Sequence, residues 1–211
     1  MSRNSSIGVA DLTRIAIFAA LIAVLGIPGS IPAFGGAVPI TAQTLGVMLA
    51  GAVLGPWLGA TAVIVFEVLV LIGLPLLSGG RGGVAVFVGP SAGYLLGWIT
   101  GAFVVGLILR ADLRRPTWWR TALACFVGGV VVVYAIGIPV QSFVTGLPLG
   151  ATALSSLVFL PGDLIKVALT SAIVVALWRA YPAAFHRANV SAPAQREEIA
   201  RAEAGRDPAA P

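Results

Sequence analysis

Long apolar runs occupy most of this chain and restrict what it can fold into. A helix needs about 20 apolar residues to cross the ~30 Å hydrocarbon core of a bilayer, and runs of roughly that length recur along the sequence. Only 10% of the 211 residues are charged and 58% are apolar, whereas a soluble domain carries about a quarter charged residues. We therefore expect an all-α integral membrane protein, folded as a bundle of six transmembrane helices.

The six runs give the expected boundaries. They are Leu12–Ile27, Val38–Leu54, Trp57–Leu77, Val84–Leu109, Thr121–Val140 and Ser156–Trp178. The first run could instead be a signal peptide, because basic residues surround its start, but no small-residue cleavage site lies at the right distance. Residues 1–187 then form one transmembrane substrate-binding domain. Residues 188–211, rich in Ala, Pro, Arg and Glu, form a cytoplasmic tail that we expect to be disordered.

Positive charge is distributed unevenly between the two sides of the predicted bundle. Cytoplasmic loops are enriched in Lys and Arg. With a cytoplasmic N-terminus, eleven of the 13 basic residues fall inside, while Arg81 falls in an outer loop and Lys166 within the last run. We therefore expect both termini inside. The basic residues are scattered around the membrane ends, so the expected surroundings are a lipid bilayer and not nucleic acid.

Gly-x-Pro segments interrupt the chain on the outer side. They begin at Gly26, Gly73 and Gly137, each expected to end a helix, and at Gly146 in the following loop. Proline breaks helices, and glycine suits the left-handed geometry at a helix end. Each could be ordinary helix termination, but four breaks on one side suggest a cavity closed by the outer loops.

Asp163 and Lys166 are the strongest candidates for binding a ligand. They lie three residues apart in the segment PGDLIK, residues 161–166, so a helix places them on one face. Ionisable residues in a membrane are costly and usually face a cavity or each other. The alternative is a pair that only neutralises itself and caps the helix. We favour a polar anchor for a small ligand.

The segment SGGRGG, residues 78–83, is the second candidate. Its glycines let the backbone approach a ligand closely, and the guanidinium of Arg81 suits a carboxylate. The alternative is a plain flexible loop. The chain has no GxxxxGK[ST] motif, so it does not bind ATP through a P-loop. Tyr94, at the start of the fourth run, either stacks on a ligand or anchors the helix at the membrane interface.

Three further candidates are polar residues inside the predicted spans. Gln43 and Thr44, in the second run, either bond helix to helix or reach the cavity. Glu67, in the middle of the third run, is either a protonated structural acid or a cavity residue. The sequence has no HExxH motif, no Cys/His cluster and no Ser-His-Asp set, so we expect no metal, no cofactor and no hydrolase activity.

Four alanines on the first predicted helix have the spacing of close helix contacts. Ala16/Ala20 and Ala19/Ala23 are small-xxx-small pairs, which allow helix backbones to approach each other. The pairs either pack within the fold or form a docking surface for a partner.

The ordered set of polar segments resembles the BioY family, the biotin-specific S components of energy-coupling-factor transporters. The segment VPITAQTL, residues 38–45, resembles the family's second-span signature. Residues 73–75, 78–83, 89–90, 93–94 and 161–166 match in order and approximate spacing. The resemblance covers roughly residues 10–180. Glu67 departs from it, because an apolar residue is expected there, and so does the charged tail.

This resemblance implies a function and a set of partners. It implies a biotin site near the outer face in a multi-pass protein of a prokaryotic cell membrane. Energy would come from a transmembrane coupling protein and two ATPase subunits, and the alanine pairs resemble the motif that docks on the coupling protein. Asp163 would accept a ureido N–H of biotin, and Lys166 would donate to the ureido oxygen or the carboxylate. Arg81 would bind the carboxylate and Tyr94 would cover the apolar body.

Two alternatives remain open at this point. The first is an S component for another small vitamin. The second is an intramembrane enzyme acting on lipid or peptide, which would need Glu67 and Asp163 close together.

Overall fold

The computed structural model describes residues 8–27, 31–33, 38–110, 116–181 and 184–185. Its strands are β1 (Ile31–Ala33) and β2 (Val38–Ile40). Its helices are α1 (Val9–Val24), α2 (Gln43–Leu54), α3 (Pro56–Leu71), α4 (Ala85–Val88), α5 (Ala92–Arg110), α6 (Trp118–Phe126), α7 (Val133–Thr145), α8 (Leu149–Ser156) and α9 (Leu160–Ala180). The π-helical segment η2 (Val127–Val132) joins α6 to α7, and the 3-10 turn η3 (Leu157–Phe159) joins α8 to α9.

Helical stretches dominate the described part of the chain. Three of them are long and apolar enough to cross a membrane: Ala92–Arg110, Trp118–Thr145 and Leu149–Ala180. The helices α2 and α3 are shorter and apolar, and a turn at Gly55 separates them, where φ is +81° and Pro56 follows as the first helical residue. The expected helical membrane architecture is therefore present, apart from one small pair of strands.

The second and third runs do not form uniform helices over their expected lengths. Val38–Ile40 forms β2, which pairs antiparallel with β1, so α2 begins only at Gln43. The physical reason is that a residue before proline avoids the helical region, and Pro32 and Pro39 face each other in this pairing. The third run ends as a helix at Leu71, short of the expected Leu77, and Gly73 follows with φ of +106°.

The fourth run is likewise not one helix. It is divided into α4 and α5, because Gly89 before Pro90 is extended and ends α4.

The last two runs form longer helices than expected. The expectation that Gly137-Ile138-Pro139 ends a helix is wrong, because Pro139 lies inside α7, which ends at the left-handed Gly146. Gly137 packs closely instead: a Cβ there would lie 2.5 Å from the ring of Tyr94. The final helical stretch begins at Leu149, well before Ser156.

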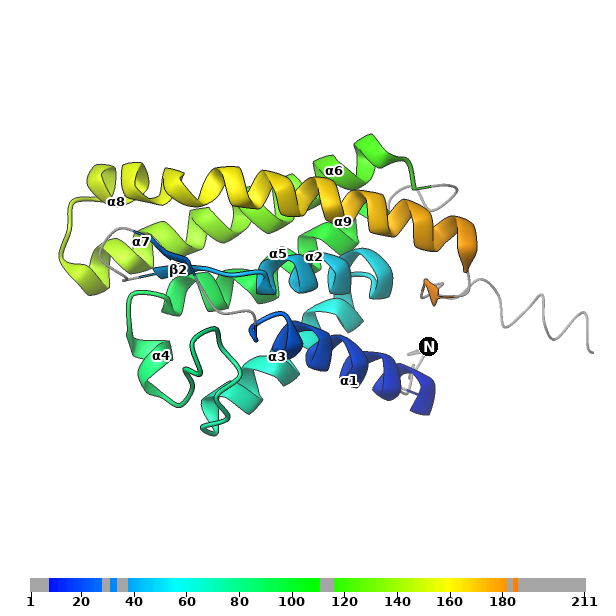
Figure 1. Cartoon of the computed structure of the whole chain (residues 1–211), viewed down its shortest axis with the longest axis horizontal. Coiled ribbons are helices and arrows are strands. Elements are labelled where there is room, and N and C mark those ends of the chain that lie inside the picture. The colour runs from blue at the N-terminus through cyan, green and yellow to red at the C-terminus, as the bar shows by residue number, and fades with distance from the viewer. Residues whose placement is uncertain (1–7, 28–30, 34–37, 111–115, 182–183, 186–211) are drawn as a thin grey trace, which may run out of the picture.

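Helix α5 lies at the centre of the bundle, against α2, α3 and α7 (Figure 1). Glycines spaced four apart form its contact with α7 and η2. A Cβ at Gly93 would meet Val140, one at Gly97 would meet Val133, and one at Gly101 would meet the carbonyl of Gly128. Small residues at this spacing allow two helix backbones to touch, which brings the side chains of α5 close to those of α7.

Helix α1 is part of this core. Ile15, Ala19 and Ile22 are buried and contact the remaining helices, which favours a helix of the bundle over a signal peptide. The four alanines of α1 do not share one environment: Ala19 is buried and Ala23 is half-buried, while Ala16 and Ala20 are exposed. The alanine pairs therefore divide into an inner and an outer face.

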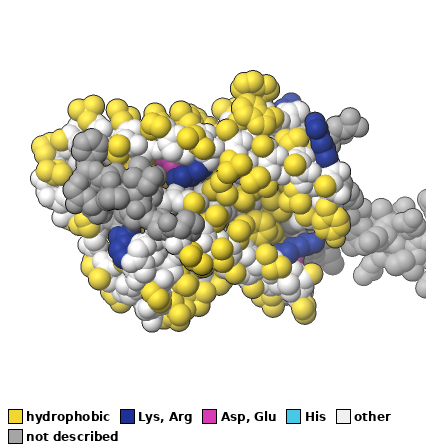
Figure 2. Space-filling model, in the orientation of Figure 1, with side chains coloured by type: hydrophobic (Ala, Val, Ile, Leu, Met, Phe, Trp, Pro, Cys, Tyr) yellow, Lys and Arg dark blue, Asp and Glu magenta, His cyan; other side chains and the backbone are white. Residues whose placement is uncertain are grey.

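The two ends of the bundle differ. One end of the molecule contains the first turns of α1 and α6 and the last turns of α5 and α9 (Figure 1). The other end contains α4 and the turn from α7 to α8. The face seen in Figure 2 is largely apolar, with basic groups at only a few places. Large hydrophobic side chains such as Ile17, Val68 and Leu164 are exposed, as expected for helices that face lipid.

Candidate ligand-binding site

A pocket opens between the start of α2 and the helices α5, α7 and α9. Its cavity volume is small, about 60 Å³. Most of its wall is apolar or aromatic, and its polar groups gather on one side. The lining residues are Thr41, Thr44, Tyr94, Trp98, Gly129, Val133, Tyr134, Phe159, Asp163 and Lys166.

Asp163 and Lys166 form an ion pair in the pocket wall. Lys166 Nζ donates to Asp163 Oδ1 at 2.9 Å, and only 5% of Asp163 is exposed. Asp163 lies in the first turn of α9 and Lys166 about one turn later, so the i, i+3 spacing aligns them. Because the pair is almost closed to solvent, each charge depends on its hydrogen-bond partners for stability.

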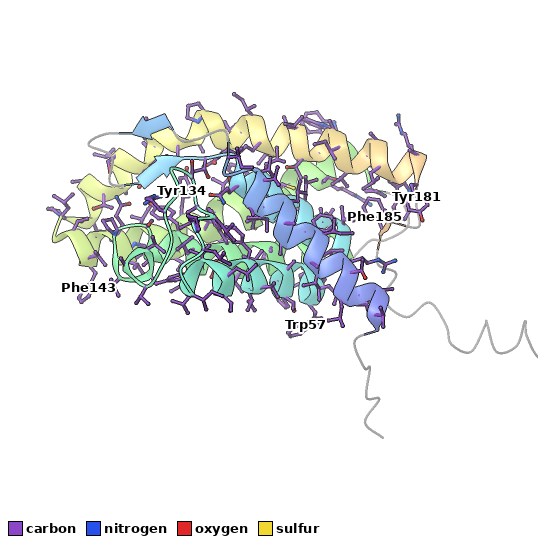
Figure 3. The ribbon with its side chains drawn as sticks, turned by 60° about the horizontal axis from the view of Figure 1, so that its bottom comes forward. Trp57, Tyr134, Phe143, Tyr181 and Phe185 are labelled. Carbon is purple, nitrogen blue, oxygen red and sulfur yellow. The ribbon has the colours of Figure 1, made fainter. Side chains whose placement is uncertain are left out.

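Two partners from distant segments complete this network. Tyr134 Oη on α7 donates to Asp163 Oδ2 at 2.6 Å, and Lys166 Nζ donates to Thr44 Oγ1 on α2 at 2.9 Å. Figure 3 shows that Tyr134 lies within the bundle, whereas Phe143 lies at one end and Tyr181 and Phe185 at the other. The carboxylate is thus fixed from both sides before any ligand binds.

The network keeps unused hydrogen-bonding capacity on its pocket side. An ammonium has three donors and each carboxylate oxygen has two acceptor positions. Lys166 uses two donors and each oxygen of Asp163 accepts one bond. One N–H donor and two acceptor positions therefore remain for a ligand. A small neutral group that carries both N–H donors and a carbonyl fits this arrangement.

Tyr94 is buried within the bundle. Its hydroxyl donates to Gln141 Oε1 at 2.8 Å and lies 3.0 Å from Ser156 Oγ. Its ring makes edge contacts with Tyr134 and Phe159, with centroids 6.4 Å apart in both cases. This burial favours a role within the bundle over an anchor at the membrane interface. Tyr94 supplies an aromatic wall next to the charged pair.

A second, smaller pocket adjoins the first and contains Arg81. Its cavity volume is about 40 Å³, and it shares Thr41, Tyr94 and Trp98 with the first pocket. Arg81 Nε donates to Ser78 O at 3.3 Å, and partial burial lowers the pKa of the Arg81 guanidinium from its ordinary value. Because the guanidinium is partly desolvated, a carboxylate beside it would interact more strongly than at an open surface.

Gln43 and Thr44 have different roles, although they are neighbours. Gln43 Nε2 donates to the carbonyls of Ile22 and Leu76, and its Oε1 accepts from the backbone N–H of Ser78. Gln43 thus bonds α2 to α1 and to the loop that carries Arg81, and it also lines the second pocket. Thr44 faces the first pocket and holds Lys166.

Several pocket residues are not among the candidates from sequence. Tyr134, Trp98 and Phe159 are aromatic residues within apolar runs, where nothing local distinguishes them from core residues. Gln141 and Ser156, which hold the hydroxyl of Tyr94, are polar residues at the boundaries of two such runs. The polarity of Gln141 is the one signal that could have been used, as it was for Gln43.

Glu67 does not belong to either pocket. It is 5% exposed, and its Oε1 has no hydrogen-bond partner among the described residues. The neighbouring buried positions on α3, Val63, Phe66 and Val70, are all apolar. Glu67 is absent from the lining of the pocket that contains Asp163, so the structure gives no two-acid site.

The sequence model of the BioY family matches residues 1–183. This chain belongs to the BioY family. Its likeness to members extends over nearly their whole length.

Two curated relatives and one solved structure illustrate this likeness. The biotin transporter BioY of Rhodobacter capsulatus is 45% identical over 183 residues, which cover 82% of this chain and 96% of the relative. The biotin transporter BioY of Rhizobium etli is 45% identical over 177 residues, which cover 82% of this chain and 95% of the relative. A crystal structure of the S-component for biotin from an ECF-type ABC transporter has a TM-score of 0.77 and 39% identity, covering 85% of this chain and 95% of that one.

Proposed function

We propose that this protein is the biotin-binding subunit of an energy-coupling-factor transporter. It captures biotin at the outer side and delivers it across the membrane. The observation that carries the proposal is the buried network of Asp163, Lys166, Tyr134 and Thr44 in a pocket, within a chain of the BioY family. The BioY family consists of transporter components, so the alternative of an intramembrane enzyme is set aside.

The chemistry of biotin matches the polar side of the pocket. Its ureido group carries two N–H donors and one carbonyl acceptor. The free acceptor positions of Asp163 take a ureido N–H, and the third N–H of Lys166 donates to the ureido oxygen. Lys166 Nζ lies 2.9 Å from Asp163 Oδ1. Because Asp163 binds the ureido N–H, this short distance favours the ureido oxygen over the biotin carboxylate as the acceptor for Lys166.

The rest of biotin matches the remainder of the cavity. The thiophane ring packs against Tyr94 and Trp98, which line both pockets. The side chain then runs into the second pocket, where Arg81 binds the carboxylate. Opposite ends of one ligand thus meet the charged pair and Arg81. A nanomolar affinity corresponds to about 12 kcal/mol, and the apolar walls supply the area that the few polar contacts cannot.

The topology follows from the distribution of charge. We propose six crossings with both termini in the cytoplasm, counting α6–η2–α7 and α8–η3–α9 as one crossing each. One end of the bundle contains four arginines at helix ends. They are Arg14 near the start of α1, Arg110 at the end of α5, Arg120 near the start of α6 and Arg179 near the end of α9. That end is the cytoplasmic one because cytoplasmic loops are rich in arginine. We place the membrane domain at residues 1–187 and a cytoplasmic tail at residues 188–211, which lie outside the described part of the chain.

The membrane partners are proposed on the same basis. The protein lies in the cell membrane of a prokaryote with a transmembrane coupling protein and two ATPase subunits. The docking surface is narrower than the four alanines suggest, because Ala19 is buried and unable to contact a partner. Ala16 and Ala20, which are exposed on α1, form its centre, with the half-buried Ala23 at its edge.

Biotin binding by the purified chain tests the proposed function. Purification from cells grown with biotin should yield protein with bound biotin, and the stripped protein should bind biotin in a calorimetric titration. Other small vitamins serve as controls. A protein that binds one of these and not biotin would support the alternative S component, and one that binds none would contradict the proposal.

Cysteine labelling tests the topology. Val84 and Trp119 are both well exposed, at 63% and 77%, and lie at opposite ends of the bundle. A membrane-impermeant maleimide should label Val84→Cys in intact cells and Trp119→Cys only after permeabilisation. The buried Cys125 provides an unreactive background. The reverse pattern would invert the orientation.

A further inference from the structure

A groove between α6 and α9 lies away from the ligand-binding pocket. It is found where α6 begins and α9 ends, and it shares no lining residue with either pocket described above. Its volume is about 550 Å³. The lining residues are Pro116, Thr117, Trp118, Val175, Trp178 and Arg179.

The chemical character of the groove changes with depth. Arg179 is exposed on the last turn of α9. Val175 lies four residues earlier, which is about 6 Å further into the bundle at 1.5 Å per residue. Trp118 and Trp178 line the groove beside them, and indole rings favour the boundary between acyl chains and head groups. From its edge inward, the groove offers a cation, amphipathic rings and then an apolar wall.

The electrostatics of the groove favour an anion. All its lining residues are neutral except Arg179, and no ion pair to Arg179 is found in the part of the chain that the structure describes. The side chain of Thr117 makes no capping hydrogen bond at the start of α6, so its hydroxyl adds a donor. A guanidinium can donate two parallel hydrogen bonds to a phosphate.

We propose that this groove binds an anionic phospholipid from the leaflet around this end of the bundle. Its phosphate head group meets Arg179 and Thr117, its glycerol region meets the two indoles, and an acyl chain passes over Val175. Basic pockets between transmembrane helices are a known means of binding acidic lipid head groups. A soluble phosphate would use Arg179 alone and leave the aromatic and apolar wall uncovered. The site extends the proposed function, since a fixed lipid would tie α6 to α9 independently of biotin.

Lipid retention by the full-length protein tests the proposal. The protein is placed in nanodiscs that contain phosphatidylglycerol and phosphatidylcholine and is then released from them under mild conditions. Native mass spectrometry measures the mass of the protein together with the lipids that remain bound. Wild-type protein should keep phosphatidylglycerol in preference to phosphatidylcholine. Arg179→Gln should lower this preference about fivefold, the effect of one basic residue near an anionic membrane surface. Trp118→Leu should shorten the retention of either lipid.

Arg120→Gln is the matched control, because Arg120 carries the same charge on the first turn of α6 but does not line the groove. It should retain phosphatidylglycerol as wild-type protein does. Unchanged biotin affinity in all three variants shows that they are folded. Equal preference in wild-type protein and Arg179→Gln would overturn the proposal. So would displacement of the lipid by soluble glycerol phosphate, which would indicate a site for free phosphate.

Discussion

Tyr134 Oη lies 2.6 Å from Asp163 Oδ2, which joins two helices through residues 29 positions apart in the sequence. On the other oxygen of the same carboxylate, Lys166 donates from 2.9 Å. A buried carboxylate with a donor on each oxygen has one orientation, so the acceptor positions that remain point in fixed directions. This preorganisation is a property of α7 and α9 together.

The charged pair should determine affinity for biotin. Asp163→Asn and Lys166→Ala are each expected to weaken biotin binding at least about tenfold, because removing one partner of a buried charged hydrogen bond costs about 2–5 kcal/mol. Calorimetric titration of purified variants measures this.

The double variant Asp163→Leu/Lys166→Leu separates binding from stability. Replacing a buried ion pair by apolar residues is often neutral or stabilising, so this protein should fold and fail to bind. Wild-type biotin affinity in the double variant would show that the pair serves the structure alone.

Tyr134 should act by positioning Asp163. Tyr134→Phe keeps the ring and removes only the hydrogen bond, which to a charged group is worth about 1.5–3 kcal/mol, so we expect biotin affinity to fall about tenfold. Tyr181→Phe is the matched control, since Tyr181 is exposed at the end of α9 and lines neither ligand pocket. In the Asp163→Asn background, Tyr134→Phe should have a much smaller effect. Equal effects in both backgrounds would mean that the two residues act independently.

Arg81 should recognise the carboxylate and nothing else. Arg81→Gln is expected to weaken biotin binding about tenfold, since a hydrogen bond between charged groups contributes about 1.5–3 kcal/mol. The same change should leave the affinity for biotin methyl ester almost unchanged, because the ester carries no charge. Both ligands are titrated against both proteins. An equal loss for the two ligands would place Arg81 away from the carboxylate.

The two faces of α1 should respond differently to added bulk. Ala16 and Ala20 lie on the exposed face of α1. The variants Ala16→Trp and Ala20→Trp should therefore keep their biotin affinity, but they should reduce biotin uptake in cells that contain the coupling protein and ATPases. Ala19→Trp instead inserts a large ring at a position that is 3% exposed, and it should lower the thermal stability of the purified protein. Normal uptake by both outer variants would exclude this face as the docking surface.

The sequence alone determined the membrane class, the family and the main charged pair. Apolar runs with few charges permit only a membrane fold, since their backbone groups must be bonded internally in lipid. Asp163 and Lys166 are recognisable because their i, i+3 relationship is local and ionisable residues are conspicuous in such runs. The helix breaks at Gly73 and Gly146 are also local, since their left-handed backbones are accessible to glycine at little cost.

Only the tertiary structure decided which residues meet across the bundle. Pro139 is a helix breaker by sequence, yet α7 continues through it and Gly137 packs on the Tyr94 ring. Tyr134 and Thr44 are unremarkable in their own runs and become part of the site through bonds to α9. Local sequence sets backbone preference and polarity over a few residues. The partners of a side chain depend on how closely spaced glycines, such as Gly93 and Gly97, let helices far apart in the chain approach each other.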